Sequence, residues 1–91
     1  MYYELKKKIY QEFASANVLG VELEHNGFKG GDAGHGGFVK ITLENLASTA
    51  MEVNGKEADK VELVFMGDSE RCTIISAFKM IVKELEDNPS V

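Results

Sequence analysis

The sequence has little of what would cross-link the chain or carry it through a membrane. It contains a single cysteine, Cys72, one proline and no tryptophan. One cysteine excludes a disulfide within the chain, which fits a reducing compartment. No apolar run approaches the length of about 18 residues that a membrane-spanning helix needs, and no charged-then-apolar leader opens the chain. We therefore expect a cytoplasmic protein that does not contact a membrane.

Basic charge is also scarce. Lys and Arg number 10 against 15 Asp and Glu, which gives a net charge of −5. Binding to duplex nucleic acid requires a basic face, because phosphate contacts supply most of the affinity. The one dense basic run, Lys6-Lys7-Lys8, is flanked by Glu4 and Glu12. Duplex nucleic acid is therefore not an expected partner.

The 91 residues are enough for one domain with a single core. Apolar residues recur at Leu5, Ile9 and Phe13, a spacing that predicts a helix over 2–15. A second helix is predicted over 69–86, where Asp68 or Ser69 would accept hydrogen bonds from the first turn. Alternating apolar and polar residues predict four strands, over 18–25, 37–43, 49–53 and 60–66.

This order of elements predicts an α+β fold in which a helix, a four-stranded antiparallel meander and a second helix follow one another. Both amphipathic helices would cover one face of the sheet. The other face would be polar, with Phe38 and Val64 as apolar exceptions that leave room for a contact between copies. We therefore expect a homo-oligomer.

The same order predicts which connections lie together. In a four-stranded meander, the first and third connections share one end of the sheet. The run 27–37 would then lie beside the 54–59 turn, and the start of the second helix would lie at the other end, roughly 15–20 Å away.

The run 27–37 is the most unusual segment, since it holds six of the nine glycines of the chain. Ordering glycine costs more conformational entropy than ordering any other residue, so a long glycine tract between two strands requires a reason. The tract is not a P-loop or a dinucleotide-binding fingerprint, because a strand follows it and not a helix. We interpret it as a binding loop. Its candidate contact residues are Lys29, Gly30, Gly31, Asp32, Gly34, His35, Gly36 and Gly37.

Three other groups could carry chemistry. His25, Asp32 and His35 could form a small metal site, although a local hydrogen bond between Asp32 and His35 is the simpler interpretation. Cys72 lies in the first turns of the second helix and is expected to be a buried structural residue. Arg71, the only arginine, is expected to pair with Glu70 or another nearby acid, with anion binding as the alternative.

Two strings resemble a pair found in small uncharacterised bacteriophage and prophage proteins. One is Gly30-Gly31-Asp32-Ala33-Gly34-His35-Gly36-Gly37. The other is Phe65-Met66-Gly67-Asp68-Ser69-Glu70-Arg71-Cys72-Thr73. The resemblance covers roughly residues 20–86 and departs after the loop, where Phe38-Val39 stands in place of Arg-Thr. It implies a phage accessory gene and no particular chemistry.

These observations predict a non-catalytic binding protein that engages a host protein or a small phosphorylated, nucleotide-like ligand through the glycine-rich loop. The phage resemblance suggests a role against host defence. No cofactor or metal is expected. Two alternatives remain open: a small metal-dependent hydrolase using His25, Asp32 and His35, and a structural component of a virion or assembly.

Overall fold

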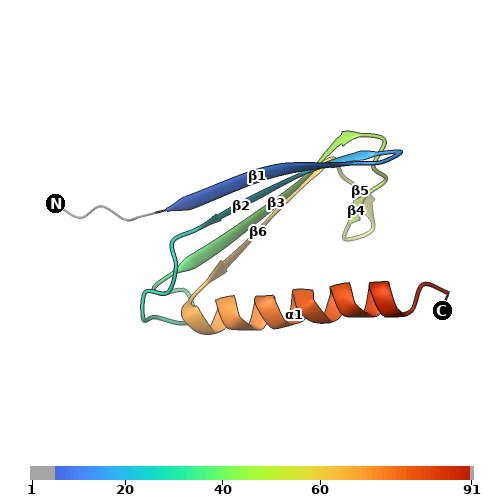
Figure 1. Ribbon diagram of the computed structural model, residues 1–91. Helices are drawn as coiled ribbons and strands as arrows, with labels where there is room; N and C mark the ends of the chain where they lie inside the picture. The colour runs from blue at the N-terminus through green and yellow to red at the C-terminus, as the bar shows by residue number, and fades with distance from the viewer. Residues whose placement is uncertain (1–5, 91) are drawn as a thin grey trace.

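The computed structural model describes residues 6–90 and shows an antiparallel sheet with one helix along one of its faces (Figure 1). The sheet has the strand order β1-β2-β3-β6. Its strands are β1 (Lys7–Ala14), β2 (Val18–His25), β3 (Phe38–Ala47) and β6 (Lys60–Met66). A separate hairpin is formed by β4 (Glu52–Val53) and β5 (Lys56–Glu57), and the helix is α1 (Asp68–Asp87). In this part of the chain, no helix has both the length and the apolar character that crossing a bilayer requires.

The helix predicted over 2–15 is wrong for the residues that the structure describes, because residues 7–14 form β1, an edge strand of the sheet. Residues 2–5 of that prediction lie outside the described residues. The error has a simple cause: Ile9 and Phe13 are four residues apart, and this spacing keeps two side chains on one face of a strand as well as of a helix. The described fold therefore has one helix, and the predicted arrangement of two helices on one face is corrected.

The strand predicted over 49–53 is also not a member of the main sheet. Only Glu52–Val53 pairs, and its partner is Lys56–Glu57 across the Asn54-Gly55 turn. Asn54 and Gly55 both have positive φ angles, of 55° and 78°. This short hairpin is an excursion between β3 and β6, which pair directly with each other from Phe38–Met66 to Glu44–Lys60.

The face of the sheet that carries α1 is apolar along its length. Val39 pairs with Phe65 and Ile41 with Leu63 in the register of β3 and β6. The same face continues onto β1 and β2 through the pairs Ile9–Leu23 and Phe13–Leu19. Among the residues that the structure describes, Val39 is the one apolar side chain that is buried, with 7% of its surface exposed. It lies at the end of the sheet where α1 begins.

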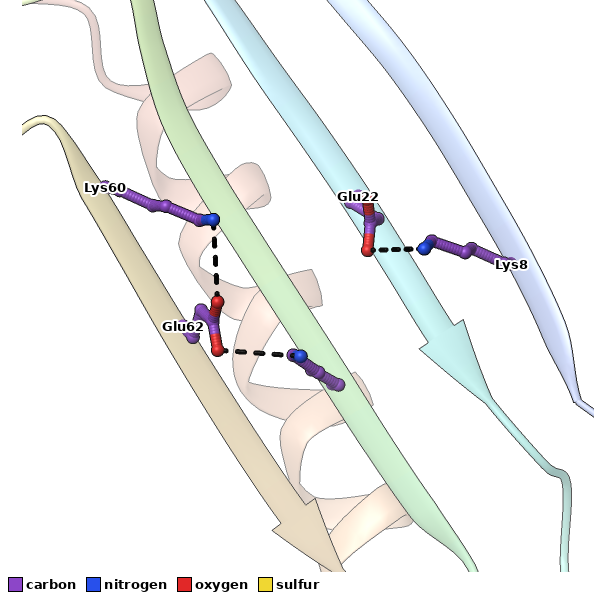
Figure 2. A network of polar contacts seen from close by, with 5 residues as sticks. Lys8, Glu22, Lys60 and Glu62 are labelled. Atoms are coloured by element: carbon purple, nitrogen blue, oxygen red, sulfur yellow. Dashed lines mark ion pairs between the residues drawn. The ribbon is translucent and has the colours of Figure 1, made fainter.

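The opposite face of the sheet is charged, as the alternation predicts. Lys8 Nζ lies 3.5 Å from Glu22 Oε1, and Glu62 bridges Lys40 and Lys60 at 3.5 and 3.7 Å (Figure 2). These side chains are solvent-exposed, and ion pairs of this kind contribute little stability, typically about 0–1 kcal/mol each. The charged face therefore keeps one side of the sheet in water.

Truncation of the buried valine tests where the core lies. We expect Val39→Ala to lower the free energy of unfolding by about 2 kcal/mol, because it opens a cavity at the covered end of the sheet. The control is Val64→Ala on the charged face of β6, where the side chain is 55% exposed and the expected change is within about 0.5 kcal/mol. Urea unfolding followed by circular dichroism measures both values. Equal losses would place the core elsewhere.

Candidate functional site

The glycine-rich loop and the start of α1 form one corner of the molecule, which comprises residues 26–37 and 67–71. The sequence predicts the opposite, with the two segments at different ends of the sheet. That prediction counted 49–53 as a full strand. The β4–β5 hairpin stands outside the main sheet, so β6 pairs directly with β3 and runs antiparallel to it. β6 therefore ends at the same end of the sheet as β2, where the glycine-rich loop begins. Figure 1 shows the loop lying beside the first turn of α1.

Three carboxylates hold this corner together. The Asp68 carboxylate accepts the backbone N–H groups of Lys29 at 3.0 Å and Gly30 at 2.8 Å. The Glu70 carboxylate accepts the N–H of Ala33 at 3.0 Å. In return, Asp32 Oδ1 of the loop accepts the N–H of Ser69 in α1 at 2.6 Å. The helix start and the loop thus satisfy each other's backbone donors.

Backbone hydrogen bonds reinforce the same contact. The N–H of Gly67 donates to the Gly37 carbonyl at 2.7 Å, and that of Asp68 donates to the Gly31 carbonyl at 2.6 Å. The N–H of Gly34 donates to the Met66 carbonyl at 3.0 Å. Several of the amides that could hold a phosphate are therefore committed within the protein. The corner is built as a structural joint, and a phosphate cradle made by the loop is not favoured.

The cap of α1 differs from the predicted one. Gly67 occupies the N-cap position, where no side chain of its own can cap the helix. The acceptor comes instead from Asp32, which is 37 residues earlier in the chain. Hydrogen bonds from the Ser69 backbone lower the pKa of Asp32 below its ordinary value of 3.8, because they favour the charged carboxylate. Asp32, predicted as a ligand contact, is thus a capping residue.

Replacement of Asp32 should expose this role through its dependence on pH. The lowered pKa of Asp32 in the folded state means that its contribution is complete above the ordinary value of 3.8 and is lost as the pH falls through the lower folded value. We expect Asp32→Ala to lower the melting temperature by several degrees at neutral pH, and this difference to shrink in strong acid. Thermal melts of both proteins across the acidic range measure it.

Asp32→Asn is the matched control. It keeps a side-chain oxygen that can accept from Ser69 but cannot titrate. We expect it to retain more of the stability at neutral pH than Asp32→Ala and to remove this group's contribution to the acid dependence. A difference between wild type and Asp32→Ala that stays constant into strong acid would contradict the capping role of the carboxylate.

At Gly67, where β6 meets α1, the backbone itself demands glycine. Its φ and ψ angles are 127° and 158°, a region that other residues essentially do not occupy. A Cβ atom there would also contact Glu70 Oε1 and lie 2.8 Å from Asp32 Cα and 3.0 Å from Ala33 N. The loop approaches Gly67 too closely for any side chain.

We therefore expect Gly67→Ala to lower the free energy of unfolding by about 3 kcal/mol or more, since strain and overlap add. Gly55→Ala is the control, because Gly55 also has a positive φ but nothing lies within 4 Å of an added Cβ. Its expected loss is about 1–2 kcal/mol. Urea denaturation measures the loss in unfolding free energy for both variants. Equal losses would show that the packing of the loop against Gly67 contributes nothing to stability.

The remaining predicted contact residues have less specific positions. His35 is exposed, and its backbone N–H donates to the Asp32 carbonyl at 3.2 Å, so the expected local hydrogen bond joins main-chain atoms. Gly36 packs against Gly31 across the loop. Within residues 6–90, no three His, Cys, Asp or Glu side chains gather closely enough to hold a metal ion. The three residues of the predicted metal site, His25, Asp32 and His35, are not brought together as a ligand set.

Arg71 has the most distinctive surroundings in the corner. Its Nη1 atom lies 3.1 Å from His25 Nδ1, and its guanidinium carbon lies 4.9 Å from the centre of the Phe28 ring. The backbone N–H of Gly27 also donates to His25 Nδ1, at 3.3 Å. Because both partners are donors, Nδ1 is an acceptor and the His25 ring carries its proton on Nε2. The expected ion pair with Glu70 is not formed.

A pocket of about 180 Å³ opens next to Arg71, between β2, β3 and α1. Arg71 and His25 are its polar members. The rest of its wall is aliphatic or aromatic and consists of Leu23, Val39, Ile41, Ile74, Ile75 and Phe78. We call this the Arg71 pocket. It combines an apolar cavity with one cationic group.

Sequence reasoning found part of this site. Arg71 stands out as the only arginine, but its contact with His25 depends on the strand order and could not be read from spacing. Cys72, predicted to be buried, is exposed.

Comparison with known proteins adds no relative: no family model matches the chain, and no curated protein or solved structure is similar to it. The function must therefore be argued from the geometry of the site.

Proposed function

We propose that this protein is a non-catalytic binding protein whose ligand is a small molecule with an apolar body and one anionic group. The apolar body would occupy the Arg71 pocket, and the anionic group would lie on the guanidinium of Arg71. The observation that carries this proposal is the state of Arg71 in the free protein. It is a partly buried cation at the end of an apolar pocket, with one nitrogen unsatisfied.

The charge of Arg71 has no counter-ion within the described residues. None of the ion pairs formed there includes Arg71. Its Nε atom is buried without a hydrogen-bond partner, and its two other contacts are to a neutral imidazole and an aromatic face. Removing a cation from water without a paired charge is unfavourable. An anionic ligand would supply the missing charge, and guanidinium groups suit carboxylates and phosphates in particular.

The walls and the volume of the Arg71 pocket indicate the polarity and the size of the ligand body. Apart from Arg71 and His25 they offer no polar side chain, so the body of the ligand is expected to be aliphatic or aromatic. A volume of about 180 Å³ is below the range of roughly 300–1,000 Å³ that is usual for drug-sized ligands. The site therefore favours a short acid over a whole nucleotide.

A binding role is favoured over catalysis by how the candidate catalytic groups are used. The hydrolase alternative needs His25 and Asp32 as free ligands or bases. Nδ1 of His25 already accepts from Gly27 and Arg71, and the Asp32 carboxylate accepts from Ser69. Both groups are engaged in holding the corner. A phage origin, a host protein as partner and a role against host defence stay predictions from the sequence.

The proposal is tested by a titration that separates charge from apolar body. We expect hexanoate to shift the amide resonances of residues 39–41 and 71–75 in a saturable manner in NMR spectra of the labelled protein. Hexanol has a similar body without the charge, and inorganic phosphate has charge without the body. Each is expected to bind at least about 10-fold more weakly, since hydrogen bonds to charged groups contribute about 1.5–3 kcal/mol.

Arg71→Gln should weaken hexanoate binding by about 10-fold or more for the same reason. Lys29→Gln is the matched control, since it removes a cation from the loop but not from the Arg71 pocket, and its affinity should equal that of wild type. Binding that is lost in Lys29→Gln and kept in Arg71→Gln would move the site to the loop. No saturable shift with any of the three probes would overturn the proposal.

A further inference from the structure

The chain leaves more surface exposed than is usual for a folded monomer of its size. Its accessible surface is 6957 Å², whereas a folded monomer of 10.0 kDa exposes about 5,200 Å². The excess is about 1,700 Å², and about 900 Å² remains if the residues outside 6–90 are discounted at the value for an unfolded chain. A standard protein interface removes about 800 Å² from each partner. The excess is thus the size of one interface.

The exposed apolar side chains are concentrated where α1 and the sheet part from each other. In Figure 1, α1 begins at the end of β6, and the strands rise away from it toward the β4–β5 hairpin. Leu63 is exposed although it lies on the face of the sheet that carries α1. On the same face, Ile9 is 44% and Phe13 51% exposed on β1, whereas the main contacts of α1 with the sheet are to β6 and β3.

An apolar stripe along α1 matches this face of the sheet, and its C-terminal part is exposed. Ile74, Phe78, Ile81 and Leu85 are spaced by four, three and four residues, which places them along one side of the helix. Ile81 and Leu85 are both exposed, Leu85 by 71% of its surface. One chain therefore carries an uncovered apolar sheet face and an uncovered apolar helix stripe.

We propose that a second copy of this chain covers these surfaces, in a symmetric dimer. The C-terminal half of α1 from each protomer would pack on the β1–β2 half of the partner's sheet. In a two-fold symmetric dimer, the helix stripe of each copy covers the sheet face of the other copy. Both apolar surfaces are therefore buried in each protomer. The lengths are compatible, because half of the 20-residue helix spans about 15 Å and fits along a strand of eight residues, which spans about 27 Å.

Charge fixes the direction of the partner helix. The last turn of α1 has no basic residue and carries Glu84, Glu86 and Asp87. Asp87 is paired with Lys83 at 2.7 Å, and the other two carboxylates add negative charge at the negative end of the helix dipole, which is unfavourable. Lys7 lies on the same face of β1 as Ile9, at the end of the sheet near the loop. A symmetric pair with antiparallel helices brings the acidic end of one α1 to Lys7 of the other copy and places Leu85 near Ile9.

The dimer is tested by sedimentation equilibrium of the full chain from micromolar to millimolar concentration. We expect a mass of twice the 10.0 kDa of the chain. Leu85→Lys should raise the dissociation constant of the dimer by about 100-fold or more, because the interface contains this position twice. Leu85 makes little contact within one copy, so circular dichroism should show that the variant stays folded.

Met80→Lys is the matched control. Met80 is 62% exposed and lies on the opposite side of α1 from Phe78, so the same change of charge should leave the dimer intact. Lys7→Glu and Glu86→Lys should each weaken the dimer, and the double variant should restore it. A wild-type mass of one chain at every concentration overturns the proposal. So does dissociation by Met80→Lys to the same extent as by Leu85→Lys.

This inference does not depend on the Arg71 pocket. Within α1 the pocket is lined by residues between Arg71 and Phe78, whereas the substituted positions are Met80, Leu85 and Glu86 on α1 and Lys7 on β1. A dimer that binds no hexanoate would overturn the ligand proposal and leave the dimer proposal standing. A monomer that binds hexanoate would do the reverse.

Discussion

The exchange of hydrogen bonds between the glycine-rich loop and the first turn of α1 is the constraint on which the rest of the structure depends. Asp32 caps the helix, while Asp68 and Glu70 order the loop. Neither segment has an adequate set of partners without the other, because Gly67 supplies no cap and the loop has few side chains of its own. This joint fixes the direction in which α1 leaves β6. It also brings Arg71 to the end of β2, beside His25.

From this joint, α1 covers the sheet unevenly. The apolar layer is closed around Val39, next to the corner, and opens toward the far end of β3 and β6. The Arg71 pocket occupies the transition between the closed and the open part. The proposed ligand site and the proposed contact with a second copy both follow from this geometry: the covered core is short, and the helix extends beyond it. The charged outer face, with its exposed ion pairs, takes part in neither.

Local patterns predicted the elements that obey one clear period. The alternation of Val61, Leu63 and Phe65 gives β6, and the stripe from Ile74 to Leu85 gives α1. Residues 7–14 were mistaken for helix because Ile9 and Phe13 fit both periods, and the register with β2 decides between them. The composition of the glycine-rich loop singled it out, but its hydrogen bonds with the first turn of α1 could not be predicted from composition. Whether 49–53 joins the main sheet determines where the loop lies, and this depends on the direct pairing of β3 with β6.

The cap of α1 joins residues that are 37 positions apart, which has a consequence for the order of events during synthesis. Asp32 leaves the ribosome well before Ser69, and it has no helix to cap until β3 and β6 have both emerged. A helix of this length without a cap is only marginally stable in water, and closing so long a loop carries an entropic penalty. We therefore expect the nascent chain to form its hairpins first and its helix last.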